Sequence, residues 1–254
     1  MDPSEIQQQH QEPNIPYDVL TLPSRGITYP GNLKTIKVTY LTAADEDIMT
    51  SPNLAKNNTI VDTLLRRKVL EPGFDTTQLL ECDKEAILIF LRNTAYGPTY
   101  NLTLTDPETQ KSFEADVDLS SLSDKDITIK PNEKGEFEFV APVSNKKIMW
   151  KFLTAQEEKE IQSLNESYKN SQIIPLVTKT LEKHITEVEG MRDKSQLSQI
   201  IQLMPIKDSQ SLRKYINSNK PGLDLNVTVT APSGREVNTR VAFGSAFFRP
   251  FIGL

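Results

Sequence analysis

Clustered carboxylates are the side chains of this sequence that could best support acid–base or metal chemistry. Asp45-Glu46-Asp47 forms one cluster, and Glu157-Glu158 forms another in the second half of the chain. A threonine stands three residues before the first acid of one cluster, and the same spacing recurs before the other. This spacing is that of a capping box, in which the two side chains satisfy backbone N–H groups of a first helical turn. We therefore expect two helix starts, with a metal or acid–base site as the alternative.

Other reactive side chains occur singly. His10 and His184 are far apart in the sequence and fit no metal-binding spacing. Cys82 is the only cysteine, so an intramolecular disulfide is excluded, and no histidine near it in sequence would activate its thiol. Gly-rich phosphate loops and a Gly-x-Ser-x-Gly elbow are missing from the sequence. The sequence thus predicts no catalytic residue, no metal site and no cofactor. A pair of carboxylates brought together by folding could still cleave glycosides, so a hydrolase stays open.

Composition and charge restrict the class of partner. The chain has 254 residues, 34 acids against 29 basic residues, and a formal charge of -5. Binding to a nucleic-acid backbone requires concentrated Lys and Arg, so this balance argues against a nucleic-acid-binding adaptor. No run of apolar residues is long enough for a membrane span, and the first residues lack the features of a signal peptide. We expect a protein that is made and kept in a cytoplasm, with no membrane partner and no small-molecule substrate.

Several sequence landmarks occur twice in the same order. Ile36–Asp47 reads IKVTYLTAADED, and Ile148–Lys159 reads IMWKFLTAQEEK. Further along, Asp83 and Asp208 each open a helix-like stretch. The strand-like segments LTLTDP and VTVTAP then follow in the first and second halves. Such an ordered series predicts a duplicated unit.

The alternation of apolar residues and the positions of Pro and Gly predict an α+β fold built from two similar tandem units. Each unit has a pair of strands, a helical segment and a closing β-hairpin; residues 174–188 are expected as one long helix of the second unit. The expected boundaries are a flexible N-terminal arm over 1–16, a first unit over 17–119, a linker over 120–135, a second unit over 136–245 and an aromatic tail over 246–254.

The tail contains the candidate binding residues of the chain. Aromatic and arginine side chains are enriched at the centres of protein interfaces. The tail brings four of them together, so we predict that they bind a partner: Phe247, Phe248, Arg249 and Phe251. The alternative is that the tail folds back onto its own core.

Four segments carry a resemblance to a known family. They are LPSRGITYP, VTYLTAADEDIMTSPNL, AILIFLRNTAYGPTY and FEADVDLSSL, and residues 17–165 hold most of the likeness. These segments resemble the baseplate hub and hub-assembly proteins of T-even-like contractile-tailed bacteriophages. The resemblance implies a structural or assembly protein of the hub, not an enzyme, which binds other baseplate hub proteins. It also implies a location in the host cytoplasm during assembly, and in the virion tail baseplate if the protein stays in the particle. The alternative is a hydrolase associated with tail assembly or cell-wall penetration.

Overall fold

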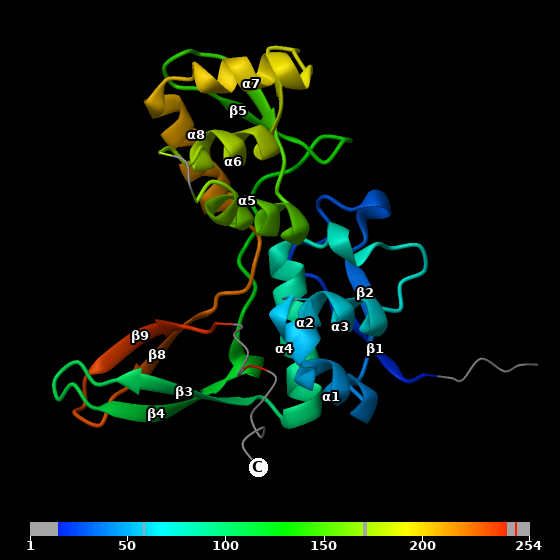
Figure 1. Cartoon of the computed structure of the whole chain (residues 1–254), viewed down its shortest axis with the longest axis vertical. Coiled ribbons are helices and arrows are strands. Elements are labelled where there is room, and N and C mark those ends of the chain that lie inside the picture. Colours follow the sequence, from blue (N-terminus) through cyan, green and yellow to red (C-terminus); the bar gives the residue numbers. More distant parts are fainter. Residues whose placement is uncertain (1–14, 58, 170–171, 243–246, 248–254) are drawn as a thin grey trace, which may run out of the picture.

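The computed structural model describes residues 15–57, 59–169, 172–242 and 247 of the chain. Helices and small antiparallel sheets are mixed along it, which confirms the α+β class. The molecule is long, with a three-stranded sheet at one end and two projecting hairpins at the other (Figure 1).

The first half contains two hairpins separated by helices. Strands β1 and β2 pair antiparallel, four α-helices follow, and β3 pairs with β4 in a second hairpin. A short 3-10 turn, η1, lies between β1 and β2, η2 precedes α4, and η3 follows β4. The bounds are β1 Tyr17–Thr21, η1 Pro30–Asn32, β2 Thr35–Thr39, α1 Ala43–Thr50, α2 Pro52–Lys56, α3 Ile60–Lys68, η2 Thr76–Gln78, α4 Glu81–Tyr96, β3 Thr99–Thr105, β4 Ser112–Asp118 and η3 Leu119–Ser121.

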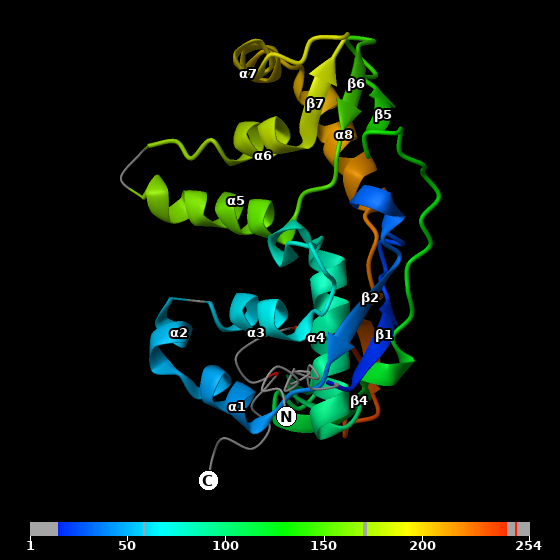
Figure 2. The same ribbon diagram turned by 90° about the vertical axis from the view of Figure 1, so that its right-hand side faces the viewer.

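The second half follows a similar order with one added strand. Strands β5, β6 and β7 form the three-stranded sheet, and β8 pairs with β9 in the closing hairpin. The bounds are β5 Phe137–Val140, β6 Lys147–Trp150, α5 Ala155–Ser167, α6 Leu176–His184, β7 Ile185–Val188, α7 Lys194–Gln202, α8 Ile206–Asn219, β8 Asn226–Thr230 and β9 Glu236–Arg240. Figure 2 shows this sheet at one end of the molecule with α8 beside it.

The expectation of a single long helix over 174–188 is wrong. Helix α6 ends at His184, and the next four residues form β7, which pairs antiparallel with β6. Three of the four residues in β7, ITEV, are β-branched, and such side chains favour strands. The open edge of β6 supplies the backbone partners, so tertiary pairing overrides the helical pattern.

Both predicted capping boxes form. The Asp45 carboxylate accepts the backbone N–H of Thr42 at 2.8 Å at the start of α1. At the start of α5, Glu157 accepts the N–H of Thr154 at 3.1 Å, and the hydroxyl of Thr154 accepts the N–H of Glu157 at 3.2 Å. Asp45 is also fully buried against Lys68 of α3, so its carboxylate joins two helices as well as capping one.

Asp83 and Asp208 have equivalent places in the two halves. Each is the third residue of its helix, and each is fully buried. Asp83 accepts the N–H of Ser24 at 2.9 Å in the loop between β1 and β2. Asp208 accepts the N–H groups of Val143 and Ser144, at 2.7 and 3.0 Å, in the loop between β5 and β6. These matching contacts support the predicted duplication, which stays a prediction.

The closing hairpins of the two halves lie together at the far end of the molecule (Figure 1). At their turns, Asp106 of the first hairpin accepts both the N–H and the hydroxyl of Ser233 from the second, at 3.1 and 2.8 Å. Residues of the expected linker run alongside the chain that returns from α8, since the backbone N–H of Lys125 donates to the carbonyl of Gly222 at 2.7 Å. The second half therefore returns to pack on the first.

We predict that Asp208→Ala lowers the free energy of unfolding by about 3 kcal/mol, because two backbone donors lose an ionised acceptor. Asp193→Ala is the matched control, since this aspartate caps α7 through one exposed bond to the N–H of Gln196. That change should cost about 1 kcal/mol. Urea unfolding of both variants makes the measurement, and equal losses would contradict the long-range role of Asp208.

Stability should also depend on acid pH. Burial would raise the pKa of Asp45, but hydrogen bonds from Lys68, Thr42 and Arg67 outweigh it and lower the pKa to about 2. Hydrogen bonds from Arg192 similarly lower the pKa of Glu136 to about 2. Carboxyl groups with depressed pKa values stabilise the fold above their ordinary pKa near 4, and the stabilisation is lost as pH falls through the folded value.

We therefore expect the free energy of unfolding to fall between about pH 5 and pH 2. Arg192→Gln should lower stability at pH 6 and have little effect near pH 2, so the two curves should converge. Arg235→Gln is the control, because its partner Glu108 is exposed. Parallel curves for Arg192→Gln and the unmodified protein would be inconsistent with this assignment.

Candidate partner-binding groove

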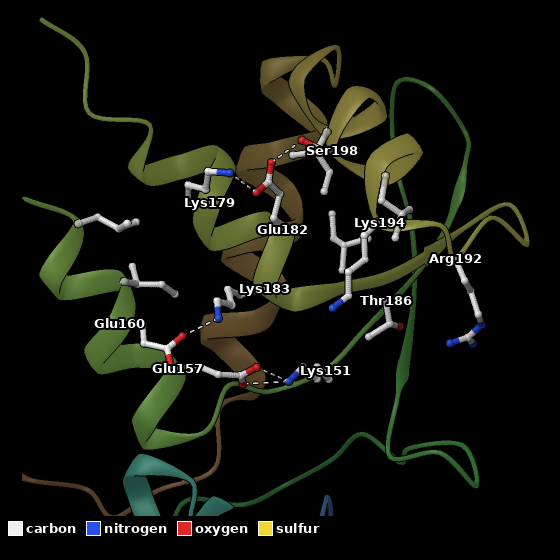
Figure 3. A pocket seen from close by; sticks show the side chains of 15 residues that line it. Lys151, Glu157, Glu160, Lys179, Glu182, Lys183, Thr186, Arg192, Lys194 and Ser198 are labelled. Atoms are coloured by element: carbon white, nitrogen blue, oxygen red, sulfur yellow. Dashed lines mark hydrogen bonds and ion pairs between the residues drawn. The ribbon is translucent and has the colours of Figure 1, made fainter. Parts of the chain in front are cut away.

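A groove of about 640 Å³ opens between α5, α6, β7 and α7 (Figure 3). It exists because α6 turns into β7, which holds α6 and α7 on the sheet while α5 lies opposite them. Its apolar side chains come from α5, β7 and α7, whereas α6 contributes charged ones: Ile161, Leu164, Ile185, Leu197 and Ile201. An apolar floor of this size with polar walls is typical of a binding site.

Most charged side chains in the walls of the groove form internal ion pairs. Lys151 binds Glu157 at 2.7 Å, and Lys183 of α6 reaches across to Glu160 of α5 at 2.6 Å (Figure 3). Two more residues of the wall, Lys179 and Glu182, pair at 2.8 Å within α6. At the end of the groove, Arg192 pairs with two carboxylates: Glu187 of β7, and Glu136, the residue before β5.

These contacts keep the wall groups charged at neutral pH. The hydrogen bond from Lys183 lowers the pKa of Glu160. Burial alone would raise the pKa of Glu182, but hydrogen bonds from Lys179 and Ser198 lower it. The hydrogen bond between Lys179 and Glu182 also raises the pKa of Lys179. A general acid requires a pKa near the working pH, and these shifts move the pKa values of Glu160, Glu182 and Lys179 away from neutral pH. The walls are suited to fixing the register of a bound protein segment.

The acids singled out in the sequence have structural partners. Glu157 lines the groove, but it caps α5 and binds Lys151. Asp45 lies in the other half, buried against Lys68. Among the residues that the structure describes, no group of three or more His, Cys, Asp or Glu side chains could hold a metal ion. The capping interpretation of these acids is confirmed.

The cysteine is buried and one histidine is half-buried. Burial raises the pKa of the Cys82 thiol, which disfavours the thiolate. His184 places Nδ1 2.8 Å from the carbonyl oxygen of Lys151, and burial lowers the pKa of its imidazole. Both shifts favour the neutral forms of these groups. The other histidine, His10, lies outside the described residues.

The tail residues are placed only in part. Phe247 is fully buried, with its ring 5.3 Å from the ring of Tyr100 and 5.7 Å from the guanidinium carbon of Arg92. This residue thus takes the intramolecular position that was the alternative to partner binding. The rest of the predicted site lies outside the described residues, so partner binding by the tail stays a prediction for Phe248, Arg249 and Phe251.

Comparison with known proteins places the chain in a family. A family model described as T4 bacteriophage base plate protein matches residues 20–248. The chain belongs to this family. The match runs from β1 past β9 and includes the whole groove. The resemblance seen in the sequence is confirmed at the level of the baseplate family. No curated protein and no solved structure gives a significant match.

The family supplies the setting for the groove. A baseplate protein belongs to the virion tail, where its neighbours are other baseplate proteins. Within the residues described, none of the helices of this baseplate protein is both long and apolar enough to cross a bilayer. Sequence reasoning missed Lys183 and Arg192 of the groove, since their partners are on other elements. The alternation of charge in α6 was the one available signal.

We predict that Phe247→Ala destabilises this baseplate protein by roughly 3–5 kcal/mol, because a buried ring is removed from a packed site. Phe247→Leu is the matched control, and it should cost less because most of the volume is kept. Thermal and denaturant unfolding make the comparison. A wild-type melting temperature for Phe247→Ala would mean that the ring does not belong to the core.

Proposed function

We propose that this baseplate protein is a structural or assembly protein of the baseplate hub and that it acts by binding other hub proteins. Its membership of the baseplate family supports the setting. The observation that carries the binding mode is the groove, in which the half-buried side chains of Ile161 and Leu164 face a hollow whose charged walls are mostly paired. The four sequence segments that resemble hub proteins support the hub as the location.

The groove provides affinity and orientation through different groups. A partner segment that covers Ile161 and Leu164, which are half-buried, removes apolar surface from water, which is the main source of association free energy. Charged pairs at the rim, such as Lys183 with Glu160, are partly exposed. Exposed pairs contribute about 0–1 kcal/mol each, so they can exchange partners at low cost while they fix the register.

The proposal also says where the protein is found during tail assembly. The protein is made in the host cytoplasm with the other tail proteins and then joins the hub. Either it stays in the virion baseplate, or it leaves once the hub is built. No step of this scheme requires bond making by the protein, and the scheme needs no cofactor, nucleic acid or membrane.

A mass-spectrometric inventory of purified hub intermediates and mature tails tests the proposal. We expect the unmodified protein in at least one of these fractions. We expect Ile161→Ser/Leu164→Ser to fold but to be depleted from them, because the apolar floor is removed. Gln162→Ser is the matched control on the exposed side of α5 and should join normally.

The outcomes separate the parts of the proposal. Absence of the unmodified protein from every fraction would reject a hub role. Normal incorporation of the double variant, with its melting temperature preserved, would reject the groove. A chain that ends after Phe247 keeps the buried ring and removes Phe248, Arg249 and Phe251. Its depletion would assign partner binding to the tail.

A further inference from the structure

Helix α8 has an outward face that carries cations and no carboxylate. At 3.6 residues per turn, six of its residues fall within an arc of about 120°. All six are exposed or half-buried, whereas the opposite face is buried through Leu212 and Ile216. The six are Ile206, Lys207, Gln210, Arg213, Lys214 and Asn217.

Large aliphatic side chains stand at the beginning of this face. Leu203 and Ile206 flank the turn from α7 into α8, and they are 85% and 75% exposed. Val143, 53% exposed, is held near the start of α8, because its N–H donates to the Asp208 carboxylate. Exposed apolar side chains that gather in one place, rather than singly, indicate an interaction site.

Leu203 also lines a second hollow, of about 460 Å³. Its wall includes Ile148, Val188, Ile200 and Met204, together with Leu203. Lys146 is the one charged residue among those that line it. The α8 face and this hollow share the α7–α8 turn, so we treat them as one surface and call it the α8 surface.

The cations of the α8 surface differ from those of the groove. In the groove, lysines such as Lys183 are neutralised by carboxylates of the same chain. On the α8 surface, none of the cations forms an ion pair with any other described residue: Lys146, Lys207, Arg213 and Lys214. This occurs in a chain whose formal charge is -5. Unpaired cations next to exposed apolar side chains are complementary to a segment that carries carboxylates beside apolar residues.

We propose that the α8 surface docks an acidic, amphipathic segment of a partner protein. Carboxylates of the partner pair with Lys207, Arg213 and Lys214, and its apolar side chains cover Leu203 and Ile206 and enter the hollow. A nucleic acid fits less well, since aliphatic side chains offer no stacking platform and the cations are few. The inference rests on the proposed function because it takes the occupant to be a protein. It adds a second binding surface, separate from the groove.

The test uses the full-length protein and a synthetic probe. The probe is a fluorescein-labelled helical peptide of about 18 residues with leucines at helical spacing and glutamates elsewhere. Its control has glutamine in place of every glutamate. Fluorescence anisotropy should show that the glutamate peptide binds more tightly, and that added salt weakens this binding.

Two double variants divide the surface. Lys207→Glu/Lys214→Glu and Leu203→Ser/Ile206→Ser should each weaken binding of the glutamate peptide by about tenfold or more, a change typical of lost interface anchors. Lys34→Glu and Ile173→Ser are matched controls at exposed positions elsewhere, and they should leave the affinity unchanged. Melting temperatures show that all four proteins are folded.

Three results would overturn the proposal. The first is equal affinity for the glutamate and glutamine peptides, or for the variants and the unmodified protein. The second is tighter binding of a DNA duplex that is lost in Lys207→Glu/Lys214→Glu, which would assign the surface to nucleic acid. The third is a dimer in solution that Leu203→Ser/Ile206→Ser abolishes, which would assign it to a second copy. These measurements need no phage tail. They can therefore reject the α8 surface while the hub role holds, or support the α8 surface while the hub role is rejected.

Discussion

A buried carboxylate that accepts backbone N–H groups from a distant loop holds each half of the molecule together. Asp83 fixes the β1–β2 loop on α4, and Asp208 fixes the β5–β6 loop on α8. Removing a carboxylate from water is costly, so the arrangement is stable only where donors replace the lost hydration. For Asp208 the donors prevail, because hydrogen bonds from Val143 and Ser144 lower its pKa despite burial. For Asp83 burial prevails and raises the pKa, even though Ser24 and Tyr29 donate to it.

The rest of the architecture depends on these two anchors. Each fixes the start of a long helix, and each long helix leads to a closing hairpin at the other end of the molecule. The two hairpins then meet through Asp106 and Ser233. In the second half, the same anchor holds the β5–β6 loop, whose strands support β7. The groove and the α8 surface are therefore both built on elements whose positions Asp208 determines.

The sequence predicted the features that depend on near neighbours. The capping boxes at Thr42 and Thr154 join residues three apart, so spacing alone was sufficient. Asp83 and Asp208 were recognised as helix starts, but their long-range partners could not be seen, because those loops are distant in sequence. The β7 strand was missed for a similar reason, since it depends on the edge of β6.

The candidate sites were harder to predict than the fold. The ion pair of Lys183 with Glu160 joins two helices, and no spacing rule connects them. For the tail, composition suggested an interface, but the same aromatic character suits a core, and Phe247 is buried. The predicted duplication is supported by matched contacts, yet the place of β7 is taken in the first half only by a single bridge between Val69 and Val38 of β2. Similar sequence landmarks therefore predict shared anchors better than they predict every element between them.

The two proposed surfaces differ in how their charge is balanced, and this difference has a physical consequence. The groove neutralises most of its own cations, so a partner gains mainly from covering the apolar side chains, and salt should change its affinity little. On the α8 surface, Lys207 and Lys214 form no ion pair with any described residue, so the affinity of this surface depends on the charge of the partner and falls with salt. An acidic partner would be steered to the α8 surface first, because charge acts over a longer range than apolar contact. Two surfaces of this kind on one rigid scaffold can hold two different neighbours in a defined relative position.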